Sequence, residues 1–241
     1  MRPLLVLVLA PAFTVLHSAR MMVASALRVP YRLGGIYDEV PRSWSRWILA
    51  VAGITVETEG LDALPPGAYV YAANHLSFID VWALMLVLPD PVRFVAKAEL
   101  ARIPFLSFAM RNSRQIFVDR ADARQALGAY DGAAAQIRAG ASAVVFPEGT
   151  RSRDGGLQPF KKGPFVLAIA AQVPVVPVGV TGSFELLRPD SAWIRSGHVR
   201  LAFGAPIPTA GMTYDDRERL LACCRERIAE LVRMAPPPAV R

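Results

Sequence analysis

The sequence is poor in the residues that most often carry covalent or metal-dependent chemistry. Two of its 241 residues are cysteine and three are histidine. Cys223 and Cys224 are adjacent, and neighbours on a helix point in different directions, which argues against a mutual disulfide. No metal-binding spacing of Cys and His is present, and neither is the Gly-x-Ser-x-Gly elbow of serine hydrolases. We therefore expect reduced bystander cysteines, no metal site and no acyl-serine intermediate.

Acidic residues are also in the minority. The chain has 20 acidic and 27 basic residues, which gives a net charge of +7, and 53% of its residues are hydrophobic. A partner that is both anionic and apolar, such as a phospholipid surface, suits this composition. Nucleic acid is the other common partner of basic proteins, but no nucleic-acid-binding motif occurs and the basic residues are interleaved with apolar runs.

Charged side chains are missing altogether between residues 3 and 19. The stretch is shorter than the about 20 apolar residues of a membrane span, and Pro11 interrupts it. A cleaved signal peptide, a short span and a pair of helices lying in the membrane interface are the competing interpretations. The motifs described below point to substrates made in the cytosol, which argues against the signal peptide.

Positive charge is concentrated beside this apolar stretch. The first 46 residues hold six arginines and two acidic residues, a net +4. Arg20, Arg28 and Arg32 follow the apolar stretch, so if that stretch spans the membrane the positive-inside rule places the rest of the chain in the cytoplasm. We predict a membrane-associating segment over residues 1–44, at the cytoplasmic membrane, and a main domain over residues 45–241.

The main domain alternates strand-like and helix-like patterns. Apolar runs of strand length occur at residues 68–73, 92–96, 143–146, 173–178 and 199–203, and helical patterns fill the intervals. This alternation predicts an α/β fold with a mixed, largely buried sheet flanked by helices. The prolines in the fourth run favour an edge strand or a bulge.

Residues 74–80 connect the first buried strand to a helix. Ser77 opens the helical pattern and Asp80 follows three residues later, which resembles a capping box. His75 is therefore expected in the turn, with Asp80 in the first turn of the helix. A carboxylate so placed can hold one imidazole nitrogen and leave the other free to accept a proton.

The Asn-His-x4-Asp pattern of residues 74–80 resembles the signature of the glycerolipid acyltransferases, the family that includes 1-acylglycerol-3-phosphate acyltransferase. Residues 116–120, Ile-Phe-Val-Asp-Arg, are similar to a second block of that family. The chain departs from this block at Arg114, where the family has Gly. Because Gly tolerates backbone angles that Arg resists, the turn before this strand is where the sequence conforms least.

Two further stretches strengthen the resemblance. Residues 146–152, Phe-Pro-Glu-Gly-Thr-Arg-Ser, match a third family block at every position, and residues 173–178 resemble a fourth block rich in Val and Pro. The four blocks occur in the family's order, and the similarity covers roughly residues 45–210. It implies the glycerolipid acyltransferase fold.

The resemblance also implies a reaction. A fatty acyl group passes from an acyl thioester, acyl-CoA or acyl carrier protein, to the free hydroxyl of 1-acylglycerol-3-phosphate, which yields phosphatidic acid for phospholipid synthesis. Both donors are substrates, so no cofactor is expected. A hydroxyl is a weak nucleophile, and a positioned base gains about 10²–10⁴-fold. His75 is the candidate base and Asp80 the residue that orients it, because His17 and His198 have no carboxylate at a useful spacing.

The phosphorylated acceptor calls for anion-binding groups. Arg120 and Arg151 offer planar guanidinium forks for phosphate oxygens, and the backbone around Gly149 and Thr150 suits an anion-binding nest. Glu148 is expected to hold an arginine or to accept a hydrogen bond from a glycerol hydroxyl. The predicted substrate-binding set is Asn74, Ser77, Arg120, Glu148, Gly149, Thr150 and Arg151.

Several alternatives remain open from the sequence. The acceptor can instead be glycerol-3-phosphate, a lyso-aminolipid or another lysophospholipid. A hydrolase that releases free fatty acid, or a non-catalytic lipid-binding membrane protein on the same fold, would be a different class of protein. Binding alone does not require the His75 and Asp80 pair, which argues against the non-catalytic alternative.

Overall fold

A seven-stranded sheet forms the centre of the computed structural model, which describes residues 2–89, 91–119 and 123–235. Its strands are β1 (Ile54–Glu59), β2 (Val70–Ala73), β3 (Val92–Lys97), β4 (Ile116–Val118), β5 (Ser142–Val145), β6 (Val175–Thr181) and β7 (Gly197–Phe203). The strand order is β1-β7-β6-β2-β5-β3-β4, and within the described residues only the β6–β7 pair is antiparallel. The predicted mixed sheet is therefore confirmed.

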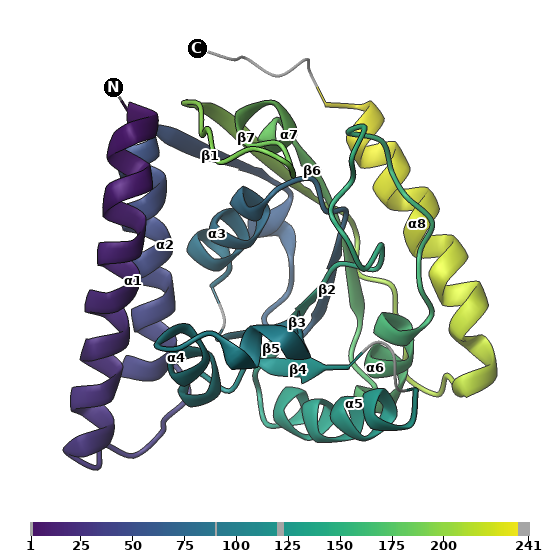
Figure 1. Ribbon diagram of the computed structural model, residues 1–241. Coiled ribbons are helices and arrows are strands. Elements are labelled where there is room, and N and C mark those ends of the chain that lie inside the picture. The colour runs from purple at the N-terminus through teal and green to yellow at the C-terminus, as the bar shows by residue number, and fades with distance from the viewer. Residues whose placement is uncertain (1, 90, 120–122, 236–241) are drawn as a thin grey trace.

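Helices cover both faces of this sheet (Figure 1). The α-helices are α1 (Arg2–Ala26), α2 (Ile36–Ala52), α3 (Phe78–Val87), α4 (Leu106–Asn112), α5 (Ala123–Arg138), α6 (Gly163–Ala171), α7 (Ser183–Leu186) and α8 (Arg217–Arg233). Three short 3-10 helices in the described chain are η1 (Leu61–Ala63), η2 (Ala98–Arg102) and η3 (Tyr214–Asp216).

The central strand β2 shows why the sheet is buried on both sides. All four of its residues are buried, and successive side chains of a strand point to opposite faces. Tyr71 and Ala73 enter the core that also contains Ile79 of α3. Val70 and Ala72 enter the core formed with α5, α6 and α8. Such a strand needs apolar residues at every position, as the sequence has.

Strand β6 lies inside the sheet, between β7 and β2, so the prediction of an edge strand from its prolines was wrong. Pro177 falls between the pairing of Val175 with Ile207 and that of Val178 with Phe203. The segment that runs beside β6, from the end of β7 to Ile207, is irregular at this point, where Gly204 donates its N–H to the Pro177 carbonyl. The missing N–H of proline therefore costs the sheet little, because the ladder is already interrupted there.

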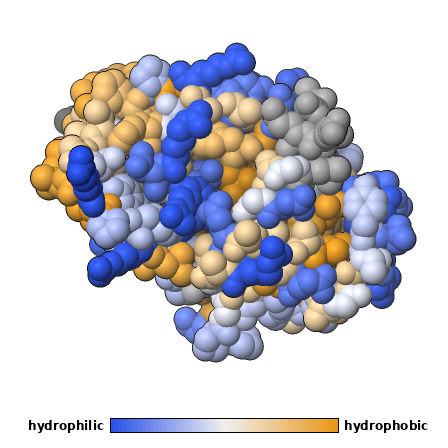
Figure 2. Space-filling view, turned by 90° about the horizontal axis from the view of Figure 1, so that it is seen from below, coloured by the Kyte–Doolittle hydropathy of each residue, from blue (hydrophilic) through white to orange (hydrophobic). Residues whose placement is uncertain are grey.

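The N-terminal segment is a helix longer than the uncharged stretch that predicted it. α1 continues through Pro11 and Arg20 to Ala26, and its part Leu4–Ala26 is long and apolar enough to cross a membrane by length and composition. Only 22% of its most apolar window is buried against the rest of the protein. In Figure 2 hydrophobic residues gather at the left edge, the side on which α1 lies in Figure 1.

Helix α2 joins this segment to the sheet. It packs along α1 (Figure 1) and ends at Gly53, which has a left-handed backbone with φ of 67° before β1 begins. Because α2 is continuous from residue 36 to residue 52, it crosses the predicted division between residues 44 and 45. The division into a membrane-associating segment and a main domain stays a prediction.

The turn before β4 contains the departure from the family pattern. Arg114 has a left-handed backbone with φ of 54°, a conformation that glycine adopts at little cost and other residues rarely adopt. Its guanidinium carbon lies 3.7 Å from the centre of the Tyr31 ring, in the loop between α1 and α2. The strain that the sequence predicted is therefore present, and a cation–π contact offsets part of it.

Candidate active site

The turn from β2 into α3 is built by local hydrogen bonds. Ser77 has an extended backbone and caps α3, because its hydroxyl accepts a hydrogen bond from the N–H of Ile79. The Asp80 carboxylate returns to the turn and accepts from the N–H of Ser77 at 2.8 Å. This is the predicted capping box with Asp at its third helical position, and it fixes the path of the chain just after His75.

His75 and Asp80 meet as the spacing predicted. The His75 Nδ1 lies 2.9 Å from the Asp80 Oδ2, which also accepts from the backbone N–H of Leu76. The other carboxylate oxygen accepts from the Ser183 hydroxyl in α7. These donors satisfy a carboxylate with no solvent exposure, and they hold the imidazole with its proton on Nδ1.

The other imidazole nitrogen of His75, Nε2, has no hydrogen-bond partner within the described part of the chain. The ring stacks on Phe146, with ring centres 3.9 Å apart and planes 16° apart, and its side chain is 15% exposed. His75 lines the cavity described below. One nitrogen is therefore fixed by a carboxylate, and the ring that carries the other borders open space.

Asn74 and Ser77 are occupied by the protein itself. The Asn74 side chain exchanges two hydrogen bonds with the backbone of Val180 in β6, at 2.9 and 2.7 Å. The Ser77 hydroxyl donates to the carbonyl of Leu187 at 2.8 Å. Both side chains are buried, and these bonds tie the turn to the strand and loop beside it. Their geometry is that of residues that position His75.

Glu148 lies against the same turn from the end of β5. Its carboxylate accepts from the backbone N–H of His75 at 3.1 Å and from that of Gln158 at 3.4 Å. Burial raises the pKa of the Glu148 carboxyl to about 7, and the two backbone hydrogen bonds only partly oppose this rise. β2 and β5 are parallel neighbours, so the two motifs meet at one edge of the sheet.

The turn after Glu148 depends on Gly149. Its φ is 77°, and a Cβ at this position would lie 3.0 Å from the Cε of Lys161. The Gly149 N–H donates to the Phe146 carbonyl at 3.0 Å, so this amide closes a turn. Thr150 and Arg151 follow and line the cavity, with the Arg151 guanidinium 4.7 Å from the centre of the Phe78 ring.

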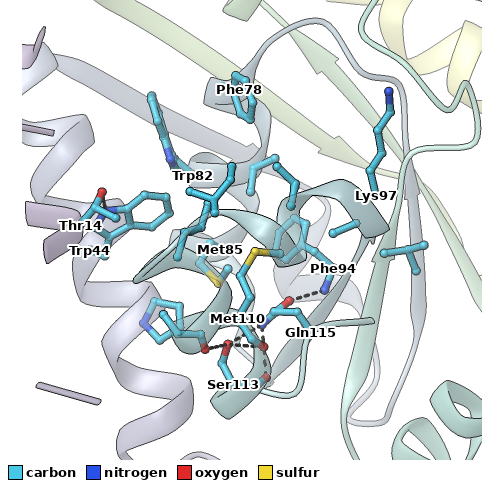
Figure 3. Close-up of a pocket in the computed structure, with 18 of the residues that line it drawn as sticks. Thr14, Trp44, Phe78, Trp82, Met85, Phe94, Lys97, Met110, Ser113 and Gln115 are labelled. Carbon is cyan, nitrogen blue, oxygen red and sulfur yellow. Dashed lines mark hydrogen bonds between the residues drawn. The ribbon is translucent and has the colours of Figure 1, made fainter. Parts of the chain in front are cut away.

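A cavity of about 460 Å³ connects these residues. Most of its wall is apolar and comes from α1, α2, α3, η2, α4 and β3, including Trp44, Trp82 and Met85. Figure 3 shows Phe78 and Lys97 at one end of the cavity, and Met110, Ser113 and Gln115 at the other. Phe78 and Lys97 are exposed whereas Ser113 is buried, so the cavity opens beside Phe78 and closes at Ser113.

The polar residues at the closed end have partners in the protein. The Gln115 amide donates to the Ser113 hydroxyl at 3.2 Å and accepts from the N–H of Phe94 at 2.7 Å. The Ser113 hydroxyl donates to the carbonyl of Ala109. These two residues are therefore satisfied, which suits an apolar ligand, whereas the buried Nε2 of His17, which also lines the cavity, has no partner in the described chain.

The structure brings His75, Thr150 and Arg151 together in the wall of this cavity, with Asp80 and Glu148 buried behind them and bonded to His75. Arg120, predicted to bind phosphate, lies outside the described residues. Sequence reasoning missed the residues of α1, α2 and α4 that complete the cavity. Their apolar spacing is the same as that of helices packed on a core, so no signal in the sequence separated them.

A family model described as Acyltransferase matches residues 55–181. A human 1-acyl-sn-glycerol-3-phosphate acyltransferase alpha is 36% identical over 166 residues, which cover 68% of this chain and 59% of that protein. A chloroplastic 1-acyl-sn-glycerol-3-phosphate acyltransferase of Brassica napus is 35% identical over 206 residues, which cover 81% of this chain and 58% of that protein. The chain thus spans less than two thirds of each relative.

A solved structure shares the fold. The crystal structure of the 1-acyl-sn-glycerophosphate acyltransferase of Thermotoga maritima superposes with a TM-score of 0.71 at 23% identity, and the alignment covers 98% of this chain and 100% of that chain. The sheet and the helices on its two faces are therefore an arrangement known from experiment.

Proposed function

The chain belongs to the acyltransferase family, and from this premise we propose that it transfers a fatty acyl group from an acyl thioester to the free hydroxyl of 1-acylglycerol-3-phosphate, which yields phosphatidic acid. The observation that carries the proposal is the His75–Asp80 pair in the wall of an apolar cavity that Arg151 also lines. A base, an apolar cavity and a cation are the three features that this reaction requires.

His75 acts as the general base in this proposal. Its Nε2 takes the proton of the acceptor hydroxyl as the hydroxyl oxygen bonds to the thioester carbonyl carbon. The tetrahedral intermediate then collapses, the C–S bond breaks, and the leaving sulfur receives the proton from the imidazolium. Asp80 stabilises that imidazolium through Nδ1, the role that Asp has in serine hydrolase triads. No cofactor enters the reaction.

The cavity holds the acyl chain in this proposal. A fatty acyl chain gains free energy from every methylene group removed from water, about 0.8 kcal/mol each. The chain would extend from His75 toward Met110 and Ser113, because the walls between them are apolar and that end is closed. The thioester would remain beside the imidazole, at the wider and more polar end.

Arg151 is the described residue best placed for the acceptor phosphate. Its guanidinium is partly exposed, lines the cavity and lies over Phe78. A fork of N–H donors beside a base suits a molecule that carries a phosphate and a hydroxyl on one glycerol unit. Asn74, Ser77 and Glu148 act in this proposal by holding the His75 turn.

The proposed location is the cytoplasmic membrane, with the main domain in the cytoplasm. The exposed apolar face of α1 and the six arginines of the first 46 residues support it, because apolar side chains enter a bilayer and cations bind its anionic headgroups. The lipid acceptor would then come from the bilayer, and the donor, acyl-CoA or acyl carrier protein, from the aqueous side.

The test is acyl transfer by the purified protein in detergent micelles, with both donor types and several lysolipids, read by mass spectrometry. His75→Ala should lower transfer to 1-acylglycerol-3-phosphate by about 10²–10⁴-fold. His198→Ala is the matched control, because that ring is paired with Thr55 and Glu57 on β1. If folded His75→Ala kept near-parental transfer, His75 would not be the general base. Release of free fatty acid in the absence of an acceptor would indicate a hydrolase instead.

A further inference from the structure

The connection between η2 and α4 exposes large apolar side chains outside the N-terminal helices. Its three residues, Ile103, Pro104 and Phe105, are all exposed, as is Arg102 at the end of η2. Ile103 is 44% exposed and Phe105 is 49% exposed. Single exposed apolar residues are ordinary on protein surfaces, but an isoleucine, a proline and a phenylalanine in succession on one short connection form a patch that water solvates poorly.

The backbone holds Phe105 outward in a strained turn. Phe105 has φ of 59° and ψ of −52°, and the Leu106 N–H donates to the Pro104 carbonyl at 2.6 Å. These features define a γ-turn of the positive-φ form, which is rare and strained. An aromatic residue gains nothing from such a backbone in water, so the strain points to a role for the side chain that it presents.

Basic residues surround this turn. Between residues 97 and 114 the exposed charged side chains are Lys97, Glu99, Arg102, Arg111 and Arg114. The segment therefore has a net charge of +3 around its apolar residues. Apolar side chains among cations are complementary to a bilayer with anionic headgroups, and less so to an ordinary protein surface.

The turn also leads into a helix that packs against α1. α4 begins at Leu106, and its Phe108 and Ala109 pack against Met21 and Ala24 of α1. Exposed apolar side chains of α1 include Leu16, Met22 and Val23, and Leu27 follows its last residue. Figure 1 shows α4 beside α1, away from α7 and β7. The turn is therefore joined to α4, which packs on the helix proposed to attach the protein to the bilayer.

Ile103 links the turn to the cavity. It lines the cavity together with Leu100 and Leu106 while being partly exposed, so it stands where the cavity meets the surface. The exposed turn therefore shares a residue with the cavity wall.

We propose that residues 102–105 are a second membrane-contacting element, which inserts Ile103 and Phe105 into an anionic phospholipid bilayer beside the cavity. The inference deepens the proposed function, on which it rests for the substrate, but membrane contact is measured independently of acyl transfer. α1 supplies attachment, and this turn orients the cavity toward the lipid.

The experiment is sedimentation of the full-length protein with vesicles of phosphatidylcholine alone or with phosphatidylglycerol. Phe105→Gly removes the aromatic ring and relieves the positive φ, so the variant should fold at least as well as the parent. It should bind both kinds of vesicle about fivefold more weakly, whereas Phe105→Trp should bind at least as tightly as the parent. Arg102→Gln should weaken binding about fivefold, to the anionic vesicles only.

Trp193→Ser is the matched control, because Trp193 is 55% exposed and lies between α7 and β7, away from α4. Parental binding by Phe105→Gly, or an equal loss in Trp193→Ser, would overturn the inference. So would a change of oligomeric state in detergent as the only effect of Phe105→Gly, because the turn would then contact a second copy. Parental acyl transfer in micelles separates these failures from a failure of the proposed function.

Discussion

Two aspartates with buried side chains each pair with a nitrogen-bearing side chain, one with a histidine at the cavity and one with an enclosed arginine. Asp80 lies 2.9 Å from His75 and Asp38 lies 2.7 Å from Arg93. His75 is 15% exposed and borders the cavity, whereas Arg93 is 1% exposed. Met85 and Gln115 line both the cavity and the small space beside Arg93. The two pairs are therefore separated by residues, among them Met85 and Gln115, that line both spaces.

The second pair ties the N-terminal helices to the sheet. Asp38 belongs to α2 and Arg93 to β3, and Tyr31, in the loop before α2, hydrogen-bonds to both. Gly34 donates its N–H to Asp38 at 2.8 Å. These hydrogen bonds join groups of the protein to one another and the Arg93 side chain is enclosed, although its buried Nε has no partner in the described chain. The comparison teaches that an ion pair supports chemistry where one partner keeps an open nitrogen, and supports architecture where both are enclosed.

Asp80→Asn is expected to have the largest effect. Asparagine fits the turn but does not stabilise the imidazolium, and it permits the wrong tautomer of His75. In serine hydrolases the equivalent change lowers kcat about 10⁴-fold, and we expect roughly 10³-fold or more here. The measurement is kcat for acyl transfer by protein whose circular dichroism matches the parent. Parental kcat would show that His75 does not depend on Asp80.

Asp38→Asn should lower stability strongly and activity little, the opposite of what we expect for Asp80→Asn. It leaves the Arg93 charge buried and without its counter-ion, which costs about 3–5 kcal/mol of unfolding free energy. Activity per folded molecule should fall much less than in Asp80→Asn. Denaturant unfolding in detergent measures the cost. Glu218→Gln, which breaks the exposed Lys162 pair, is the control and should leave the midpoint unchanged. If Asp38→Asn instead kept its unfolding free energy and lost kcat, the Asp38–Arg93 pair would not be the structural one of the two.

Glu148→Gln should change how the stability of the protein depends on pH. The pKa of Glu148 is raised by burial to about 7, so the folded protein binds more protons than the unfolded chain between the ordinary carboxyl pKa and pH 7. Stability from this group is therefore present at low pH and lost as the pH rises. The parent should lose roughly 2 kcal/mol more stability than Glu148→Gln between pH 5 and pH 8. Parallel pH profiles of unfolding would contradict the assignment.

Arg114 variants should show the smallest effects. Arg114→Gly removes the strain of the positive φ together with the contact on Tyr31, and these changes, each about 1 kcal/mol, nearly cancel. Arg114→Ala loses the contact and keeps the strain, so it should be the less stable variant by about 1 kcal/mol. Thermal unfolding of the two proteins measures the difference. Equal stability would mean that the turn is not strained.

The alternation of apolar runs and helical patterns was enough to predict the α/β class and the positions of β2, β3, β5 and β7. The pairing of His75 with Asp80 was also predictable, since His75 lies in the turn that the Ser77–Asp80 capping box ends. Interactions over a few residues depend on backbone geometry alone, and spacing reports that geometry directly.

The tertiary structure decided what lies around that pair. Glu148 meets the His75 backbone because β5 pairs with β2, and Asn74 is occupied because β6 lies on the other side. Pro177 is interior, and the cavity takes its walls from residues as far apart as Thr14 and Arg151. Strand order and helix packing bring together residues about 100 positions apart, and no spacing within the sequence records which of them meet.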